Sequence, residues 1–283
     1  MARRLTLAEP KSRLAIWAAR FAWFALAVAI LSIVIVRTGF LEVVPALVTF
    51  GGALVCAVLA ILTAFAGAIV IWRQGLSGIG RLIVAILVST ALLAYPLYLG
   101  YRAYRLPAVL DVTTNPANPP RFEVAARLRP RGTSEYAGVE AAAKQRAAYP
   151  DIAPLQVMAS PKAAFDTAMA VVAKRKWTVV DARAPAPPGR REGTIEAIAR
   201  STIMGIRDDV VIRVTPVGSG SQVDVRSASR LRYHDFGDNA ARIRALLEEI
   251  DDQVPTAEPA QKQAEPEKRQ PQRRQPQSVN QRR

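Results

Sequence analysis

The sequence predicts an α+β protein, in which an N-terminal region of three transmembrane helices precedes a small antiparallel-sheet domain with helices packed on one face. Three long apolar runs occupy the first hundred residues, and short segments of alternating polarity follow one another in the second half. Two amphipathic helical patterns flank those segments. Strands joined by short links pair antiparallel, and such a sheet needs helices to cover its apolar face.

The membrane region is predicted at 1–105, with three spans at about 14–36, 43–72 and 82–101. A helix rises ~1.5 Å per residue, so ~20 apolar residues cross a hydrocarbon core of ~30 Å. The basic start of the chain also resembles a cleaved signal peptide, but the first run is long and two more follow, which favours a retained anchor. No Asp, Glu, Lys or His lies deep within a run, which is typical of an anchor in the lipid bilayer rather than a conduit.

Basic residues beside the spans predict their orientation. The N-terminal flank and the second loop together carry seven basic residues, whereas the other two flanks carry three. The positive-inside rule therefore places the N-terminus in the cytoplasm and, after three spans, the C-terminal domain in the periplasm, with the chain in the inner (plasma) membrane. Two re-entrant pieces in place of the second span would instead leave the domain in the cytoplasm.

Composition limits the functional classes. The chain has 38 Lys and Arg residues against 23 Asp and Glu, with one His and one Cys. Cys56 lies inside the second apolar run and is interpreted as a small buried hydrophobe, so no zinc site of the His/Cys type is expected. No phosphate-binding Gly loop or dinucleotide fingerprint occurs, and we expect no cofactor. The positive charge is spread over the membrane flanks and the tail rather than one stripe, so no nucleic acid is expected as a partner.

The rest of the chain divides into three parts. Residues 106–131 are rich in proline and are predicted to form an extended connector. Residues 132–252 are predicted to form the soluble α+β domain. Residues 253–283 are basic and rich in Pro and Gln, without an apolar stripe, which is typical of a disordered tail.

Within the soluble domain, a helix at 136–148 is followed by a strand, a helix, four strands and a final helix. The predicted strands lie at 152–159, 177–180, 194–201, 209–215 and 222–226. Ser160 and Pro161 suit the N-cap and first position of one helix, and the other helix begins near Asp238. We expect both helices on one face of the sheet and a solvated second face, which would present Glu196, Arg200, Arg213, Asp224 and Arg226.

From residue 193 onward the sequence resembles the domain of unknown function 1499 (DUF1499) family. The resemblance is carried by residues 194–197, 207–213, 223–230, 235–239 and 242–243. An Arg-Ser-x-Ser-Arg run after a strand, followed by Asp-x-Gly-x-Asn and a helix, is its specific part. Residues 118–122 and 149–152 are similar to the membrane-anchored proteobacterial branch, and the likeness covers about 110–252.

The resemblance implies a compact domain with no assigned activity and no catalytic residues to carry over. The chain departs from the family at two places. Many relatives begin with an Asn-Cys-Val-Ser stretch, and this chain has no cysteine there. Relatives also tend to have Gly soon after the second Arg of the run, where this chain has residues 231–234, Leu-Arg-Tyr-His.

The best candidate site is a surface for an anion or a partner. It consists of Arg226, Ser227, Ser229, Arg230, Arg213 and Glu196. Guanidinium groups bind phosphate or carboxylate bidentately. Strand alternation, however, places the two arginines of the run on one face and the two serines on the other. The alternative interpretation is cross-strand ion pairing with Glu196, Asp208 or Asp209.

An enzymatic site is the second hypothesis. His234 next to Asp235 suggests a base with its orienting carboxylate, and Ser227 or Ser229 could be the nucleophile. Adjacent residues of a strand point apart, and the chain has no Gly-x-Ser-x-Gly elbow. The alternative is a turn-forming Asp and a surface His. A non-enzymatic periplasmic module that binds an envelope protein or an anionic envelope polymer is therefore favoured. A hydrolase acting on an anionic envelope substrate and a cytoplasmic binder of nucleic acid or another anionic polymer are the alternatives.

Overall fold

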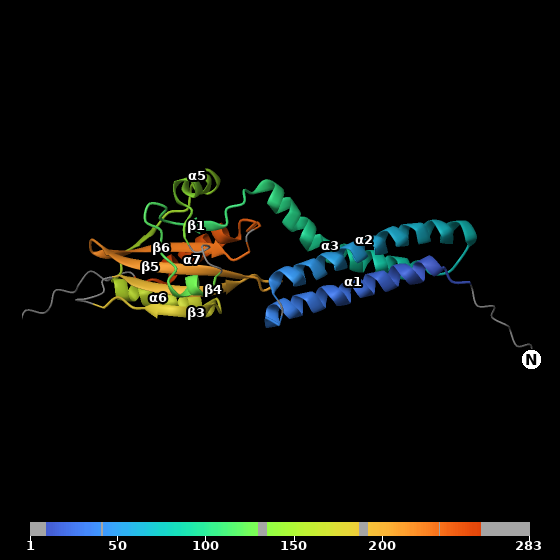
Figure 1. Ribbon diagram of the computed structural model, residues 1–283, viewed down its shortest axis with the longest axis horizontal. Helices are drawn as coiled ribbons and strands as arrows, with labels where there is room; N and C mark the ends of the chain where they lie inside the picture. The colour runs from blue at the N-terminus through green and yellow to red at the C-terminus, as the bar shows by residue number, and fades with distance from the viewer. Residues whose placement is uncertain (1–9, 41, 130–134, 187–191, 232, 256–283) are drawn as a thin grey trace, which may run out of the picture.

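The computed structural model describes residues 10–40, 42–129, 135–186, 192–231 and 233–255. It places a helical bundle at one end and a sheet domain at the other, with the start of the chain at the far end of the bundle (Figure 1). Two features predicted from the sequence fall outside the described residues: the basic flank at Arg3 and Arg4 and, beyond residue 255, the C-terminal tail.

Three helices make up the N-terminal region, as predicted. They are α1 (Arg13–Thr38), α2 (Val43–Gln74) and α3 (Ile79–Arg105), and each is long and apolar enough to cross a membrane. α1 begins where the Ser12 hydroxyl accepts a hydrogen bond from the Ala15 N–H at 3.4 Å. α1 and α2 end at Gly39 and Gly75, whose left-handed backbone an L side chain rarely adopts.

Small residues hold the bundle together. α1 and α2 bury alanines at alternating spacings of three and four, which lets the two helix backbones approach closely. α3 joins them through its first half, where Leu82, Ala85 and Ser89 are buried. Its second half leads toward the sheet domain (Figure 1), so the bundle and the domain are connected by a continuous helix.

The domain contains one antiparallel sheet. After α3 the elements are β1 (Asp111–Thr113), α4 (Val124–Arg127), α5 (Gly138–Ala148), β2 (Leu155–Val157), α6 (Pro161–Lys174), β3 (Thr178–Arg183), β4 (Gly193–Arg200), β5 (Arg207–Val217), β6 (Gly220–Ser229) and α7 (Asp238–Gln253). The strand order is β1-β6-β5-β4-β3, and β2 also pairs with β6. The predicted strand at 152–159 is reduced to the three residues of β2, and the predicted connector contains β1 and α4.

The first face of the sheet is covered by α6 and α7, as expected. Ile195, Ile212 and Val225 are fully buried there, together with Phe165 of α6 and Ile243 of α7. The Ser160 hydroxyl accepts a hydrogen bond from the Ala163 N–H at 3.3 Å, which confirms it as the N-cap of α6. The main hydrophobic core of the domain therefore lies between the sheet and this helical layer.

The expectation of a solvated second face is wrong. The segment 114–129, which includes α4, crosses this face and packs Phe122 and Ala125 against Val211 of β5 and Ala228 of β6. Glu196 and Asp224 are each 1% exposed and Arg226 is 2% exposed, whereas Arg200 remains exposed. The charged residues on this face suggested that it contacts water. They are instead paired with polar groups of the covering segment, so the sequence pattern did not indicate that the face is covered.

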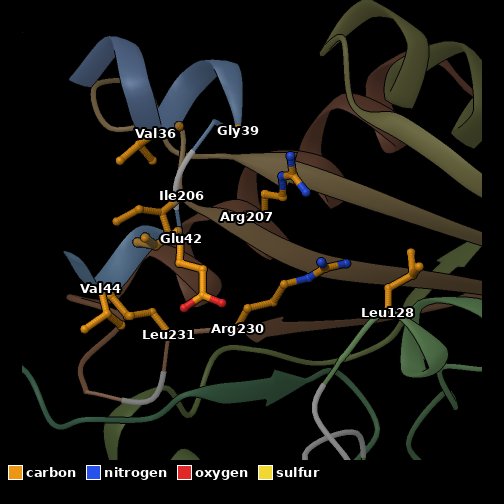
Figure 2. A pocket seen from close by; sticks show the side chains of 11 residues that line it. Val36, Gly39, Glu42, Val44, Leu128, Ile206, Arg207, Arg230 and Leu231 are labelled. Atoms are coloured by element: carbon orange, nitrogen blue, oxygen red, sulfur yellow. The ribbon is translucent and has the colours of Figure 1, made fainter. Parts of the chain in front are cut away.

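The domain contacts α1 and α2 through the turn between β4 and β5. Met204 in this turn is buried against Val36 of α1 and Ala46 of α2. The Arg37 Nη1 donates hydrogen bonds to the carbonyl oxygens of Thr202 and Ile203, at 2.6 and 3.0 Å. A hollow lies beside this contact, between the connection from α1 to α2 and the end of the sheet (Figure 2).

Candidate functional site

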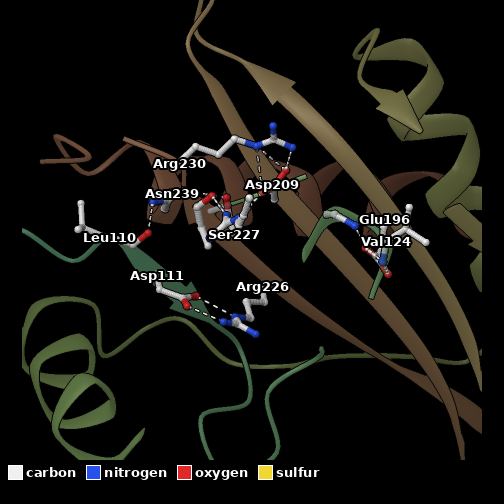
Figure 3. A network of polar contacts seen from close by, with 12 residues as sticks. Leu110, Asp111, Val124, Glu196, Asp209, Arg226, Ser227, Arg230 and Asn239 are labelled. Carbon is white, nitrogen blue, oxygen red and sulfur yellow. Dashed lines mark hydrogen bonds and ion pairs between the residues drawn. The ribbon is translucent and has the colours of Figure 1, made fainter. Parts of the chain in front are cut away.

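Arg226 has a structural role on the second face of the sheet. Its Nε and Nη2 donate to the two carboxylate oxygens of Asp111 at 2.9 and 2.7 Å, and its Nη1 donates to the Pro120 carbonyl at 3.1 Å (Figure 3). The guanidinium carbon also lies 4.7 Å from the ring centroid of Phe122 and 5.5 Å from that of Tyr136. The side chain therefore fastens β1 and the covering segment to the middle of β6.

Arg230 and Arg213 are also bound to carboxylates. Arg230 donates from Nη2 to Asp209 at 2.7 Å, and the same fully buried carboxylate accepts from the Nε of Arg129 (Figure 3). Arg213 donates to Asp224 at 2.6 Å across the β5–β6 pair. The Arg230–Asp209 contact is an ion pair that the alternative interpretation named, whereas Asp111 and Asp224, the partners of Arg226 and Arg213, were not among the carboxylates it named.

Glu196 fixes the start of α4. Its carboxylate accepts hydrogen bonds from the backbone N–H groups of Glu123, Val124 and Ala125, with the shortest distances at 2.8 Å (Figure 3). These groups are the unpaired donors of a helix start, and a carboxylate there also suits the helix dipole. Arg183 of β3 lies 3.8 Å from the same carboxylate.

Ser227 and Ser229 face α7 instead. The Ser227 hydroxyl donates to the Asn239 Oδ1 at 2.8 Å and accepts from the Arg242 Nη1 at 2.7 Å. The Asn239 Nδ2 donates to the Ser229 hydroxyl at 3.0 Å. Arg242 also binds Asp208, whose pKa is raised by burial although the guanidinium beside it acts in the opposite direction. Both serines thus dock α7 onto the sheet.

His234 and Asp235 shape the turn before α7. The His234 Nδ1 accepts a hydrogen bond from the Phe236 N–H at 2.8 Å, which puts the proton on Nε2, where it is donated to the Leu106 carbonyl at 3.1 Å. Asp235 accepts from the Asn239 N–H at 3.3 Å, and burial raises its pKa. A catalytic Asp accepts a hydrogen bond from the Nδ1–H of its His, but here Nδ1 is itself an acceptor and lies 4.0 Å from Asp235.

The structure therefore separates the candidate residues into two sets. Arg226, Arg230, Arg213 and Glu196 lie on the second face, and the two serines lie on the first, as strand alternation predicted. Ser229 and His234 have different partners and do not bond to each other. In the described ranges, no group of three or more His, Cys, Asp or Glu side chains is placed to hold a metal ion.

An open groove, which sequence reasoning missed, runs along the covering segment. It consists of two adjoining hollows of about 590 and 750 Å³, which share Ala117, Pro119 and Tyr136. One hollow is also lined by Asn118, Arg121 and Arg226, and the other by Asn115, Val139 and Arg146. The run of Asn and Pro at 115–120 was the available signal, but such a run is equally typical of a connector made of consecutive turns.

The groove carries polar side chains with spare bonding capacity. Burial raises the pKa of Tyr136, whose hydroxyl has no hydrogen-bond partner within the described residues. Arg121 and Arg146 are exposed, and neither forms an ion pair with another described residue. Val139 projects from the start of α5 and is 83% exposed. The groove can thus accept an extended ligand that offers acceptors to the guanidiniums and apolar groups to Val139.

Comparison with known families agrees with the sequence resemblance. Residues 111–250 match the family described as "Protein of unknown function (DUF1499)". Comparison with curated proteins gives no match to the chain. The match begins at β1 and ends in α7, so it takes in both β1 and the covering segment. With the sheet, α6, most of α7 and the covering segment inside the matched region, the domain that follows the three helices belongs to the DUF1499 family.

Proposed function

We propose that this protein is a multi-pass inner-membrane protein whose periplasmic domain is a non-enzymatic binding or scaffolding module of the cell envelope. The observation that carries the proposal is the groove along 114–120, which is open while the charged residues of the sheet are occupied by internal contacts. Because the arginines and Glu196 of the sheet are held by internal contacts, the groove is the concave surface left for a ligand, and the proposal assigns it a binding role.

The arrangement of the helices supports the periplasmic placement. The described start of the chain and the sheet domain lie at opposite ends of the bundle (Figure 1). If the basic N-terminal flank stays in the cytoplasm, three spans carry the domain to the other side. The basic residues Arg73 and Arg81 border the same end of the bundle as the N-terminus, which favours the same orientation.

The chemistry of the groove favours an anionic partner. Arg121 and Arg146 project from its two hollows, and guanidinium groups bind carboxylate and phosphate through paired hydrogen bonds. The Asn118 side chain adds an amide donor and acceptor beside them, whereas the Asn115 amide already donates to Asp224 and accepts from the Asn118 N–H. Glu135 also lines the hollow that contains Arg121. The partner class is therefore an acidic segment of an envelope protein or an anionic envelope polymer. Nucleic acid is not expected on the periplasmic side.

Site-specific photo-crosslinking in growing cells tests this function. A photoreactive amino acid at Val139 sits in the groove, and the same amino acid at Val217, which is 47% exposed in the β5–β6 turn, is the matched control. We expect a discrete adduct from position 139 only, and its loss on Arg146→Ala. Identical adducts from both positions would contradict a binding role for the groove.

The hydrolase alternative makes a different prediction. It places Ser229 and His234 in the reaction, so the double replacement by alanine would abolish the function of the protein in cells. The binding module predicts retained complementation of a deletion strain, provided that the variant accumulates to the wild-type level. Loss of function at normal protein level would favour the hydrolase instead.

A further inference from the structure

The hollow between the α1–α2 connection and the end of the sheet differs from the groove in the side chains that line it. It has a volume of about 420 Å³ and is bordered by the connection from α1 to α2, the start of β5 and the end of β6. Its lining includes Val36, Val44, Ile206 and Leu231 as apolar walls and Glu42, Arg207 and Arg230 as charged groups. Figure 2 shows the three charged side chains entering the hollow from three separate elements.

The hollow lies where the apolar helices begin and end. Val36 belongs to the last turns of α1, and Val44 belongs to the first turn of α2. The β4–β5 turn is anchored here by Met204 and by the hydrogen bonds of Arg37. If α1 and α2 span a bilayer, the hollow is therefore held at the level of the lipid headgroups.

Around the hollow, the arginine side chains outnumber the carboxylates that pair with them. Arg207 is exposed and has no ion-pair partner among the described residues. It also stands directly opposite Arg200 in the β4–β5 register, and like charges in that position repel. Arg200 and Arg37 bond to backbone carbonyls rather than to acids. Arg230 shares the single carboxylate of Asp209 with Arg129.

The backbone adds to this positive potential. α2 begins at the hollow, and its N-cap residue Glu42 makes no side-chain capping bond to the free N–H groups of the first turn. The positive end of the helix dipole therefore faces the same space as Arg207. The Arg207 guanidinium also lies close to Gly39, where an added Cβ would stand 3.4 Å from Nη2.

We propose that this hollow binds the phosphate headgroup of an anionic membrane phospholipid. The phosphate would lie between Arg207 and Arg230 at the start of α2, and the first part of an acyl chain would follow Val36 and Val44 into the bilayer. Paired guanidiniums suit a phosphate, and apolar walls continuous with membrane helices suit the chain attached to it. The inference requires that the three helices span a membrane, but it is independent of the partner groove and of the side on which the domain lies.

Glu42 provides a second test of the proposal, because its replacement should change the affinity for the headgroup in the opposite direction. Its carboxylate enters the same hollow and forms no ion pair within the described part of the chain (Figure 2). A negative charge there opposes an anionic headgroup, so its neutralisation strengthens binding. A headgroup that carries an ammonium would show the reverse, because Glu42 would then be a favourable partner.

Native mass spectrometry of the full chain in detergent tests the site. The protein is titrated with phosphatidylglycerol, and with phosphatidylcholine of the same chains as the lipid without net charge. We expect Arg207→Gln to weaken phosphatidylglycerol binding about tenfold, the loss of one charge-assisted hydrogen bond. Arg105→Gln is the matched control, since Arg105 is an exposed arginine at the end of α3 outside the hollow. It should change the affinity less than about twofold.

Three further measurements distinguish a bound phospholipid from a free anion and from unspecific attraction to positive charge. Glu42→Gln should raise the affinity for phosphatidylglycerol, and inorganic phosphate at equal concentration should leave the lipid bound. Arg207→Gln should melt at or slightly above the wild-type temperature, because the side chain is exposed and its replacement removes the repulsion with Arg200. Equal losses from Arg207→Gln and Arg105→Gln, equal binding of the two lipids, displacement by inorganic phosphate, or weaker binding by Glu42→Gln would each overturn the proposal.

Discussion

Buried charges decide which face of the sheet the covering segment binds. Glu196, Asp224 and Arg226 are almost fully buried, and each has a partner in or beside the segment 111–129. Taking a charge out of water is costly, and removing one member of a buried pair leaves that cost without compensation. These residues therefore specify the position of the segment more than they add to the stability of the domain.

Replacing Glu196 by alanine tests this role. The change leaves three backbone N–H groups at the start of α4 without their acceptor, so we expect a loss of about 3 kcal/mol in the free energy of unfolding. Denaturant unfolding of the full chain in detergent measures it, followed by Trp177 fluorescence in a background in which Trp17, Trp23 and Trp72 are replaced by phenylalanine. Glu140→Ala, in an exposed pair with Lys144, should leave the unfolding midpoint unchanged. Equal midpoints for the two variants would contradict the capping role.

Asp235 predicts a pH dependence of stability. Burial raises its pKa, while hydrogen bonds from Gly237 and Asn239 and the nearby His234 oppose the shift. The folded chain thus holds this proton more tightly than the unfolded chain. The stability contributed by this group is therefore full below the ordinary pKa of an Asp and is lost as the pH rises through the raised value.

Asparagine at position 235 removes this pH dependence. It keeps an acceptor for the Asn239 N–H and replaces an Oδ1 that has no hydrogen-bond partner among the described residues. In melts recorded from acid to neutral pH, we expect the melting temperature of Asp235→Asn relative to wild type to increase above the ordinary pKa of an Asp and to level off above the raised value. A difference that stays constant over this range would show that the carboxyl does not titrate as its burial implies.

At the scale of elements, local sequence patterns were sufficient to predict the longer helices and strands. α6, with its Ser160 cap, and the β4–β6 strands follow from helical spacing and alternation of side chains. β1 and α4 were missed because they have three and four residues, too few for a periodic signal. Both form through contacts with β6 and β4 that lie far away in the sequence.

Prediction of the candidate site was limited for the same reason, because the residues that contact each other lie far apart in the sequence. The alternation of the Arg-Ser-x-Ser-Arg run correctly placed its arginines and serines on opposite faces. It did not reveal that Arg226 binds Asp111, 115 residues earlier in the chain, or that Asn239 joins both serines. Long-range partners of this kind depend on tertiary packing, so a single sequence carries no local signal for them.

The β4–β5 turn makes a prediction about domain docking. Gly205 has φ +71°, and an added Cβ would lie 2.9 Å from the Arg37 Cγ, whereas Gly218 has φ +56° with nothing within 4 Å. Gly218→Ala should therefore cost about 1 kcal/mol from backbone strain alone. Gly205→Ala should cost more and also loosen the turn from α1.

Thermal unfolding and trypsin cleavage after Arg37 measure the two effects separately. Both variants should lower the melting temperature of the full chain, but only Gly205→Ala should accelerate cleavage in the connection from α1 to α2. Equal cleavage rates would show that the turn does not hold this connection.

At the scale of the whole molecule, the domain and the three N-terminal helices form one docked unit. The β4–β5 turn contacts α1 and α2, while Arg102 at the end of α3 binds Asp238 at the start of α7 at 2.9 Å. The presence of three long apolar helices followed by an α+β domain was predicted from composition and periodicity. The docking of the domain onto α1 and α2 could not be predicted in this way, because Met204 and Arg37 are 167 positions apart in the sequence and no local pattern links them.

Reporter fusions determine the orientation of this unit in the membrane. Alkaline phosphatase, which is active only outside the cytoplasm, and a fluorescent protein that matures only in the cytoplasm are each fused after Asp252. The positive-inside rule predicts an active phosphatase and a dark fluorescent fusion. Fusions after Gln74, at the end of α2, are the matched control and should give the reverse pattern, since two spans return the chain to the cytoplasm. A fluorescent fusion after Asp252 would place the domain in the cytoplasm, exclude a periplasmic partner, and make nucleic acid or another cytoplasmic anion the first ligand to test in the groove.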